Sequence, residues 1–104
     1  MSGEALFNHA PFPAEILAPL YGVSISKGAI ELSWSSSDID TGDTHTFDIY
    51  LDQTNASTLN TADHGSTKKS VTLNDLGTYY WKIITKDNYG NNSDSGVFKF
   101  TITE

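Results

Sequence analysis

Apolar and polar residues alternate with a period of two in two segments of the chain, 29–34 and 46–51. Successive side chains of a strand point to opposite faces, so every second residue of each segment faces a common core. The core residues predicted in this way are Ile30, Leu32, Trp34, Phe47, Ile49 and Leu51. No apolar run at helical spacing is long enough for a helix, and the pattern therefore predicts an all-β protein.

Turn-forming residues divide the rest of the sequence into further short runs that are rich in β-branched and aromatic residues. The seven strands predicted from these runs cover 16–20, 29–34, 46–51, 57–60, 69–73, 78–87 and 98–102. In the run 46–51, Tyr50 has outward parity and is therefore predicted to be an exposed aromatic residue. Trp34 and Trp81 have inward parity in their own runs. Seven short strands in about a hundred residues indicate an antiparallel β-sandwich.

Composition restricts the chain to one soluble domain and excludes several functions. A chain of 104 residues has room for one hydrophobic core. It has no cysteine, which rules out disulfides, thiolate metal sites and cysteine nucleophiles. Its net charge of −7 opposes binding to nucleic acid, and no run approaches the roughly 18 apolar residues of a membrane span.

The order and spacing of several motifs resemble the bacterial extracellular domains that are similar to fibronectin type III, an immunoglobulin-like fold. The matching text is Leu32–Asp40, Phe47–Leu51, Thr78–Ile83, Lys86, Asp87 and Gly90. By this resemblance Trp34 is the central core residue and Tyr79 forms a tyrosine corner, in which the phenol bonds a backbone group just upstream. The irregular, polar segment between the third strand and Lys69 departs from the family pattern, which leaves the pairing of that sheet edge open.

The resemblance also implies a location and a domain organisation. Such domains occur as accessory parts of surface lipoproteins, adhesins and glycan-degrading enzymes, so the chain is expected to be an extracytoplasmic fragment of a larger protein. Pro11 and Pro13 mark residues 1–13 as a linker or an expression-derived segment, and residues 14–104 as the domain. The expected partners are neighbouring domains of the parent chain, and the isolated domain is expected to be a monomer.

Alternate carboxylates around a glycine form a candidate calcium site at Asp38, Asp40 and Asp43. In a fibronectin-like topology, the loop that contains Asp87 lies at the same pole and would add a fourth carboxylate. The alternative is that these side chains cap turns by accepting hydrogen bonds from nearby backbone amides, as Asp commonly does. The sequence therefore predicts no cofactor, with calcium as the alternative.

Exposed tyrosines form a second candidate site. Tyr50 and Tyr80 have outward parity on strands that are expected to be neighbours, and Tyr89 lies at the acidic pole. Flat exposed rings can stack on a glycan or anchor a protein partner. The alternative is an aromatic cross-strand pair that only stabilises the sheet.

Catalysis finds little support in the sequence, and we expect no enzyme activity. The three histidines, His9, His45 and His64, are scattered over segments that the sequence predicts to be linker and loops. Exposed loop carboxylates lack the burial that would raise a pKa for acid–base chemistry. The function predicted is a non-catalytic spacer or interaction module, and a calcium- or carbohydrate-binding adhesion module is the alternative.

Overall fold

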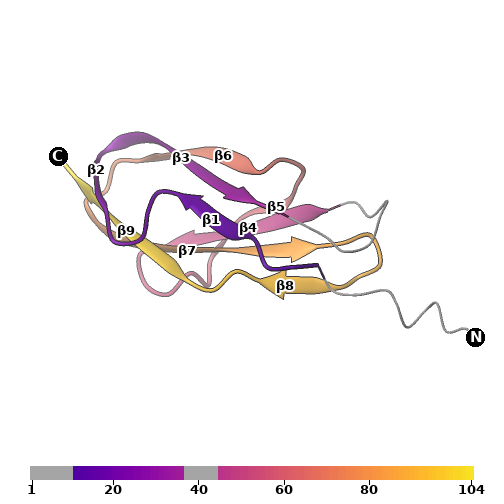
Figure 1. Cartoon of the computed structure of the whole chain (residues 1–104). Coiled ribbons are helices and arrows are strands. Elements are labelled where there is room, and N and C mark those ends of the chain that lie inside the picture. The colour runs from indigo at the N-terminus through magenta and orange to yellow at the C-terminus, as the bar shows by residue number, and fades with distance from the viewer. Residues whose placement is uncertain (1–10, 37–44) are drawn as a thin grey trace, which may run out of the picture.

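The computed structural model describes residues 11–36 and 45–104, and these form a β-sandwich of two sheets (Figure 1). The predicted calcium ligands Asp38, Asp40 and Asp43 lie outside the described residues, as does His9. The first sheet contains β1, β3 and β6, with β3 in the centre. Its strands are β1 (Glu15–Ala18), β3 (Gly28–Ser35) and β6 (Lys68–Leu73).

The second sheet has the strand order β2-β9-β7-β4-β5, and β8 pairs with β7 beside this path. Its bounds are β2 (Ser24–Ser26), β4 (Thr46–Asp52), β5 (Leu59–His64), β7 (Gly77–Lys86), β8 (Asn92–Asp94) and β9 (Phe98–Thr103). All strand pairs are antiparallel except β2 and β9, which run parallel with Ser24 opposite Thr101. The all-β sandwich predicted from the alternation is confirmed.

The core lies between the two sheets and contains the residues with inward parity. Leu32, Trp34, Ile49 and Trp81 are at most 1% exposed, so both tryptophans are core residues as predicted. The ring centroids of the two tryptophans are 6.3 Å apart, in an edge-to-face arrangement. This arrangement is favourable for aromatic pairs, and the contact joins β3 of one sheet to β7 of the other.

The tyrosine corner is confirmed. The Tyr79 hydroxyl donates a hydrogen bond of 2.9 Å to the carbonyl of Asp75, four residues upstream. Burial, followed by the nearby Asp75 carboxylate, raises the pKa of the Tyr79 phenol, so the hydroxyl stays protonated and remains a donor. The bond fixes the turn that leads into β7.

Three details of the strand prediction were wrong, each for a local reason. Two short strands, β2 and β8, were missed because three residues carry too little alternation to be recognised. The opening strand ends at Ala18 and not at residue 20, because the chain leaves the first sheet there and joins the second at Ser24. The strand expected at 57–60 is β5, which covers Leu59–His64 and therefore includes His64.

The bounds predicted for β5 were wrong because two bulges interrupt its period-two pattern. Its register against β4 shifts by one residue between Phe47 and Ile49, and again between Ile49 and Tyr50. Asp63 has a left-handed backbone, with φ of 53°. Bulges are common on edge strands, where they bend the strand and hinder pairing with another chain.

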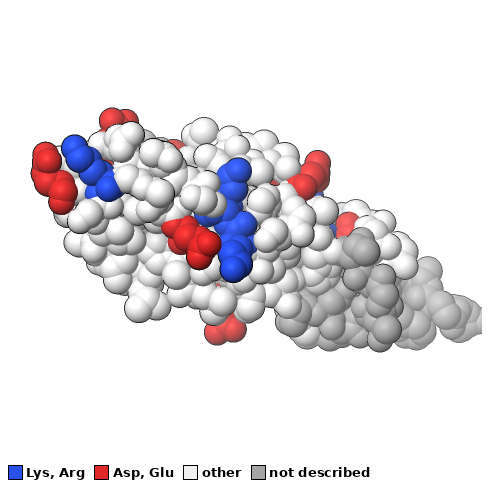
Figure 2. Space-filling model, turned by 90° about the horizontal axis from the view of Figure 1, so that it is seen from above, with Lys and Arg blue, Asp and Glu red and all other residues white. Residues whose placement is uncertain are grey.

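The outer face of the first sheet carries charges of both signs, with Glu31 of β3 and Lys68 of β6 both exposed. Figure 2 shows the face over β3 and β6, where lysines and acidic residues gather near the middle of an otherwise uncharged surface. The outward residues of β6 include Ser70 and Thr72, which are paired with Glu31 and Ala29 of β3. In the described ranges, no helix has the length and apolar character that a membrane crossing requires.

Candidate functional site

The turn between β7 and β8 forms the described part of the predicted acidic pole. The Asp87 carboxylate, which is only 9% exposed, accepts hydrogen bonds of 2.8 and 2.9 Å from the backbone amides of Tyr89 and Asn91. It also accepts a 3.1 Å bond from the Asn91 side-chain amide. Asp87 therefore caps this turn, which is the alternative role that the sequence left open.

The described residues that flank 37–44 lie at the same pole as Asp87. Thr46 is paired with Lys86, which places the start of β4 beside the turn, and Ser36 Oγ lies 2.7 Å from His45 Nδ1. The described ranges contain no cluster of three or more histidine and acidic residues placed to hold a metal ion. Because three of its four residues lie outside those ranges, the calcium site remains a prediction.

The outer face of the second sheet brings Tyr50 and Tyr80 together and leaves Tyr89 apart. Tyr50 of β4 is paired with Lys82 of β7, and Tyr80 is paired with Asp52, so the two tyrosines are diagonal neighbours. Tyr89 lies in the β7–β8 turn, 59% exposed. Eight residues separate it from Tyr80, most of them in the extended strand β7, so the three rings do not form one platform.

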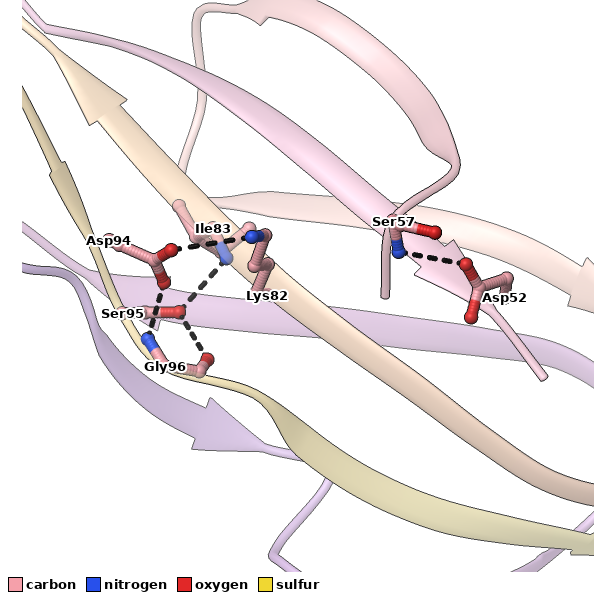
Figure 3. Close-up of polar contacts among 7 residues, drawn as sticks. All are labelled: Asp52, Ser57, Lys82, Ile83, Asp94, Ser95 and Gly96. Atoms are coloured by element: carbon pink, nitrogen blue, oxygen red, sulfur yellow. Dashed lines mark hydrogen bonds and ion pairs between the residues drawn. The ribbon is translucent and has the colours of Figure 1, made fainter. Parts of the chain in front are cut away.

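Tyr50 is half-buried and not exposed, which corrects the prediction made from its parity. The Lys82 Nζ atom lies 5.3 Å from the centroid of the Tyr50 ring and covers it. Lys82 Nζ also lies 3.3 Å from the Asp94 carboxylate (Figure 3). Parity gave the correct face for Tyr50, but it could not show that a long lysine side chain on the neighbouring strand would cover the ring.

A second lysine on this face holds two carboxylates. Lys86 Nζ lies 3.0 Å from Asp48 Oδ1 and 2.5 Å from Asp63 Oδ1. Asp48 Oδ1 also accepts a 3.0 Å hydrogen bond from the backbone amide of Asp63, the bulged residue of β5. The hydrogen bonds to Asp63 and then to Asp48 raise the pKa of the Lys86 ammonium. The cluster fastens the edge strand to the sheet.

Sequence reasoning missed Asp52, which organises the loop between β4 and β5. Its two carboxylate oxygens accept hydrogen bonds of 2.8 to 3.0 Å from five consecutive backbone amides, those of Thr54, Asn55, Ala56, Ser57 and Thr58. Figure 3 shows the bond from Ser57. The motif in the sequence is an Asp followed by small polar residues, which is typical of such caps.

The electrostatics of Asp52 follow from these bonds. Desolvation acts to raise the pKa of Asp52, but hydrogen bonds from the amides of Thr54, Ala56, Asn55 and Ser57 outweigh it and hold the pKa well below its usual range. The loop closes around the methyl group of Ala56, which is fully buried, and Ala56 has a left-handed φ of 62°. The carboxylate therefore serves the fold and is already saturated with donors.

In the connection between β8 and β9, the side chain of Ser95 bonds the backbone of β7. Ser95 Oγ accepts a 2.9 Å hydrogen bond from the Ile83 amide and donates one of 2.9 Å to the Gly96 carbonyl (Figure 3). The Asp94 carboxylate accepts a 2.7 Å bond from the Gly96 amide. The acidic and polar residues of this connection are thus turn-forming groups.

The histidines do not form a catalytic grouping within the described ranges. His64, which was expected in a loop, lies at the end of β5, where its Nε2 is 2.7 Å from the Lys68 carbonyl and its ring packs against Trp34. His45 pairs with Ser36 and packs edge-on against Phe47. Both contacts tie strands or loop ends together, so the geometry supports structural roles for both residues.

The sequence matches no protein-family model, and comparison with curated proteins also gave no match. Solved structures do resemble it. A fibronectin(III)-like module of Clostridium thermocellum CbhA has a TM-score of 0.65 at 18% identity, over 86% of this chain and 93% of the module. The chain has the fibronectin type III fold.

A human structure supports the same assignment. The fibronectin type III domain of human fibronectin type III domain containing protein 3 has a TM-score of 0.61 at 17% identity, and the match covers 91% of this chain and 88% of that domain. The fibronectin type III fold accounts for the two sheets, the buried Trp34 and the tyrosine corner. At such identities the similarity concerns the fold, and function has to be argued from the residues of this chain.

Proposed function

We propose that this fibronectin type III-like chain is a non-catalytic accessory module of a secreted or surface-anchored bacterial protein, in which it spaces neighbouring domains. The observation that carries the proposal is that the first and last described residues lie at opposite poles of the domain. Pro11, the first described residue, is buried against β8, where Ser93 Oγ donates a hydrogen bond to its carbonyl. The chain leaves at the opposite pole, where Glu104 lies 3.9 Å from Lys27 (Figure 1).

The internal use of charged groups supports this function over catalysis. The carboxylates of Asp48, Asp52, Asp87 and Asp94 all bind amides or lysines of the same domain. A catalytic acid or base needs a shifted pKa and access to substrate. The similar fold of a module of Clostridium thermocellum CbhA supports the choice of a module of a bacterial protein.

Distance measurements between the two poles test the spacer function. Because the chain has no cysteine, spin labels can be attached specifically to Phe12→Cys and Glu104→Cys, and their separation can be measured by double electron–electron resonance. The ten residues of β7 set a pole-to-pole length on the order of 30–40 Å. We expect a single narrow distribution in that range.

The control pair Glu31→Cys and Leu59→Cys, both exposed positions within strands, gives the width caused by the labels alone. A pole-to-pole distribution much broader than this control, or one with two maxima, would show that the domain does not fix the separation of its ends. That result would refute the spacer function.

A further inference from the structure

The connection between β1 and β2 presents two large apolar side chains to solvent. Leu20 is 66% exposed and Tyr21 is 62% exposed. The Val23 amide donates a 3.2 Å hydrogen bond to the Leu20 carbonyl, and Gly22 has φ of 80°. This is the geometry of a type II turn, in which the third residue needs a positive φ and the second residue, here Tyr21, stands at the corner.

The turn is fixed to the second sheet by its backbone. The Gly22 amide donates a 2.8 Å hydrogen bond to the Lys99 carbonyl, and the Thr101 amide donates one of 2.8 Å to the Val23 carbonyl. The turn therefore continues the pairing of β2 with β9. A side chain held on a fixed backbone loses less conformational entropy on binding, which favours its use as an anchor.

Residues of β9 and of the connection before it complete an apolar surface around Tyr21. The Phe98 ring lies edge-on to Tyr21, with centroids 5.9 Å apart, and Lys99 Nζ lies 5.9 Å from the Tyr21 centroid. Val97, next in sequence, is 46% exposed. We call Leu20, Tyr21, Val97, Phe98 and Lys99 the turn patch.

The charge of the turn patch is opposite to that of the chain. The sequence has thirteen acidic residues and six basic ones, yet Lys99 forms no ion pair with any residue in the described ranges. Lys27, Lys82 and Lys86 each contact a carboxylate, whereas Lys68 and Lys69 of β6, like Lys99, form no ion pair within the described residues. Of these three lysines, Lys99 is the one that lies over an aromatic ring, that of Tyr21. The exposed aromatic and aliphatic side chains thus surround a cation whose counter-charge is not supplied by this part of the chain.

We propose that the turn patch docks an extended segment of a protein partner in which an apolar side chain lies next to an Asp or Glu. The apolar side chain packs on Leu20 and Tyr21, and the carboxylate binds Lys99. Tyrosine anchors at the centre of an interface commonly contribute most of its binding energy. A glycan fits less well, because Leu20 and Val97 offer no hydrogen-bonding group to sugar hydroxyls. The proposal goes beyond the spacer function and is independent of the distance measurement.

Selection from a phage library of random twelve-residue peptides tests the proposal. The library is first depleted of peptides that bind the Tyr21→Ala variant and is then selected on the biotinylated wild-type domain. Tyr21 is exposed, so its variant is expected to fold. We expect the enriched peptides to combine an apolar residue with an adjacent Asp or Glu. For a synthetic peptide of that kind, we expect Tyr21→Ala to weaken binding about tenfold and Lys99→Gln about threefold, measured by calorimetry.

Two matched variants and one competing ligand make the result specific. Tyr89→Ala removes an equally exposed tyrosine at the acidic pole, and Lys68→Gln removes a lysine of β6, so neither should change the affinity. No enrichment, enrichment without acidic residues, or equal loss on Tyr89→Ala would overturn the proposal. Amide shifts at residues 20–23 and 97–101 on titration with a galacturonate hexasaccharide would overturn the choice of a peptide.

Discussion

Replacement of Asp52 by Asn tests whether one carboxylate holds the β4–β5 loop. In the folded protein this group accepts five backbone hydrogen bonds. An Asn can present only one acceptor oxygen, and its amide group would face backbone donors. A single capping residue contributes about 0.5–2 kcal/mol, and bonds to a charged acceptor contribute more. Because the loop amides can be solvated by water, we expect a loss of about 2 kcal/mol.

Urea or thermal unfolding followed by tryptophan fluorescence measures this loss, since Trp34 and Trp81 are buried only in the folded state. A loss of about 2 kcal/mol in a domain of this size lowers Tm by roughly 8–16 °C. Asp75→Asn is the matched control, because Asp75 is an exposed turn residue whose carboxylate forms no hydrogen bond or ion pair within the described residues, and its backbone carbonyl, which accepts the bond from Tyr79, is kept. We expect its unfolding free energy to change by less than about 0.5 kcal/mol.

The pH dependence gives an independent check. The pKa of Asp52 is lower in the folded state than in the unfolded state, where it is roughly 3.9. Its contribution to stability is therefore fully present above that pH and decreases as the pH falls toward the folded-state pKa. The difference in unfolding free energy between wild type and Asp52→Asn should be constant above about pH 5 and should shrink below about pH 4. A difference that does not change with pH would refute the reasoning.

Three further substitutions test other contacts by the same unfolding measurement. Tyr79→Phe removes only the bond to the Asp75 carbonyl and should cost about 1 kcal/mol, and an unchanged midpoint would contradict the tyrosine corner. Lys86→Met leaves Asp48 without its cation and should lower the unfolding free energy by about 1–2 kcal/mol. This loss should be constant from about pH 5 to 9, because the raised pKa of Lys86 keeps the ammonium charged throughout. The control Lys82→Met, beside the more exposed Asp94, should lower it by less than about 0.5 kcal/mol. Gly77→Ala should lower the unfolding free energy by about 1–2 kcal/mol, because Gly77 has φ of 124° and an added Cβ would lie 3.0 Å from Gln53 Nε2. The control Gly65→Ala, whose added Cβ would meet open space, should leave it unchanged.

The alternation of apolar and polar residues correctly predicted the buried face of each strand that packs on the core. It placed Phe47, Ile49 and Trp81 inward, because a shift of one residue would expose them all. It failed for β5, whose two bulges break the period, and for β2, whose three residues join a sheet by parallel pairing with the far end of the chain. Such pairing depends on tertiary contacts that no local pattern contains.

The candidate sites were less predictable for a different reason. The outward parity of Tyr50 and Tyr80 was correct, but the cover that Lys82 gives Tyr50 depends on cross-strand register. Asp87 and Asp52 show that an acidic residue in a polar loop can be fully occupied by backbone amides a few residues away. The role of Tyr21 could not be read from parity, because it lies in a turn outside any predicted strand.

The parallel pairing of β2 with β9 has a mechanical consequence. A force that pulls the two chain ends apart would draw β2 toward one pole and β9 toward the other, along the strand direction. The backbone bonds from Gly22 to Lys99, from Thr101 to Val23 and from Lys27 to Thr103 would then be loaded together in shear, and would not open one at a time as in a peeled hairpin. We expect these backbone bonds between β2 and β9 to set the rupture force of the domain when its two ends are pulled apart.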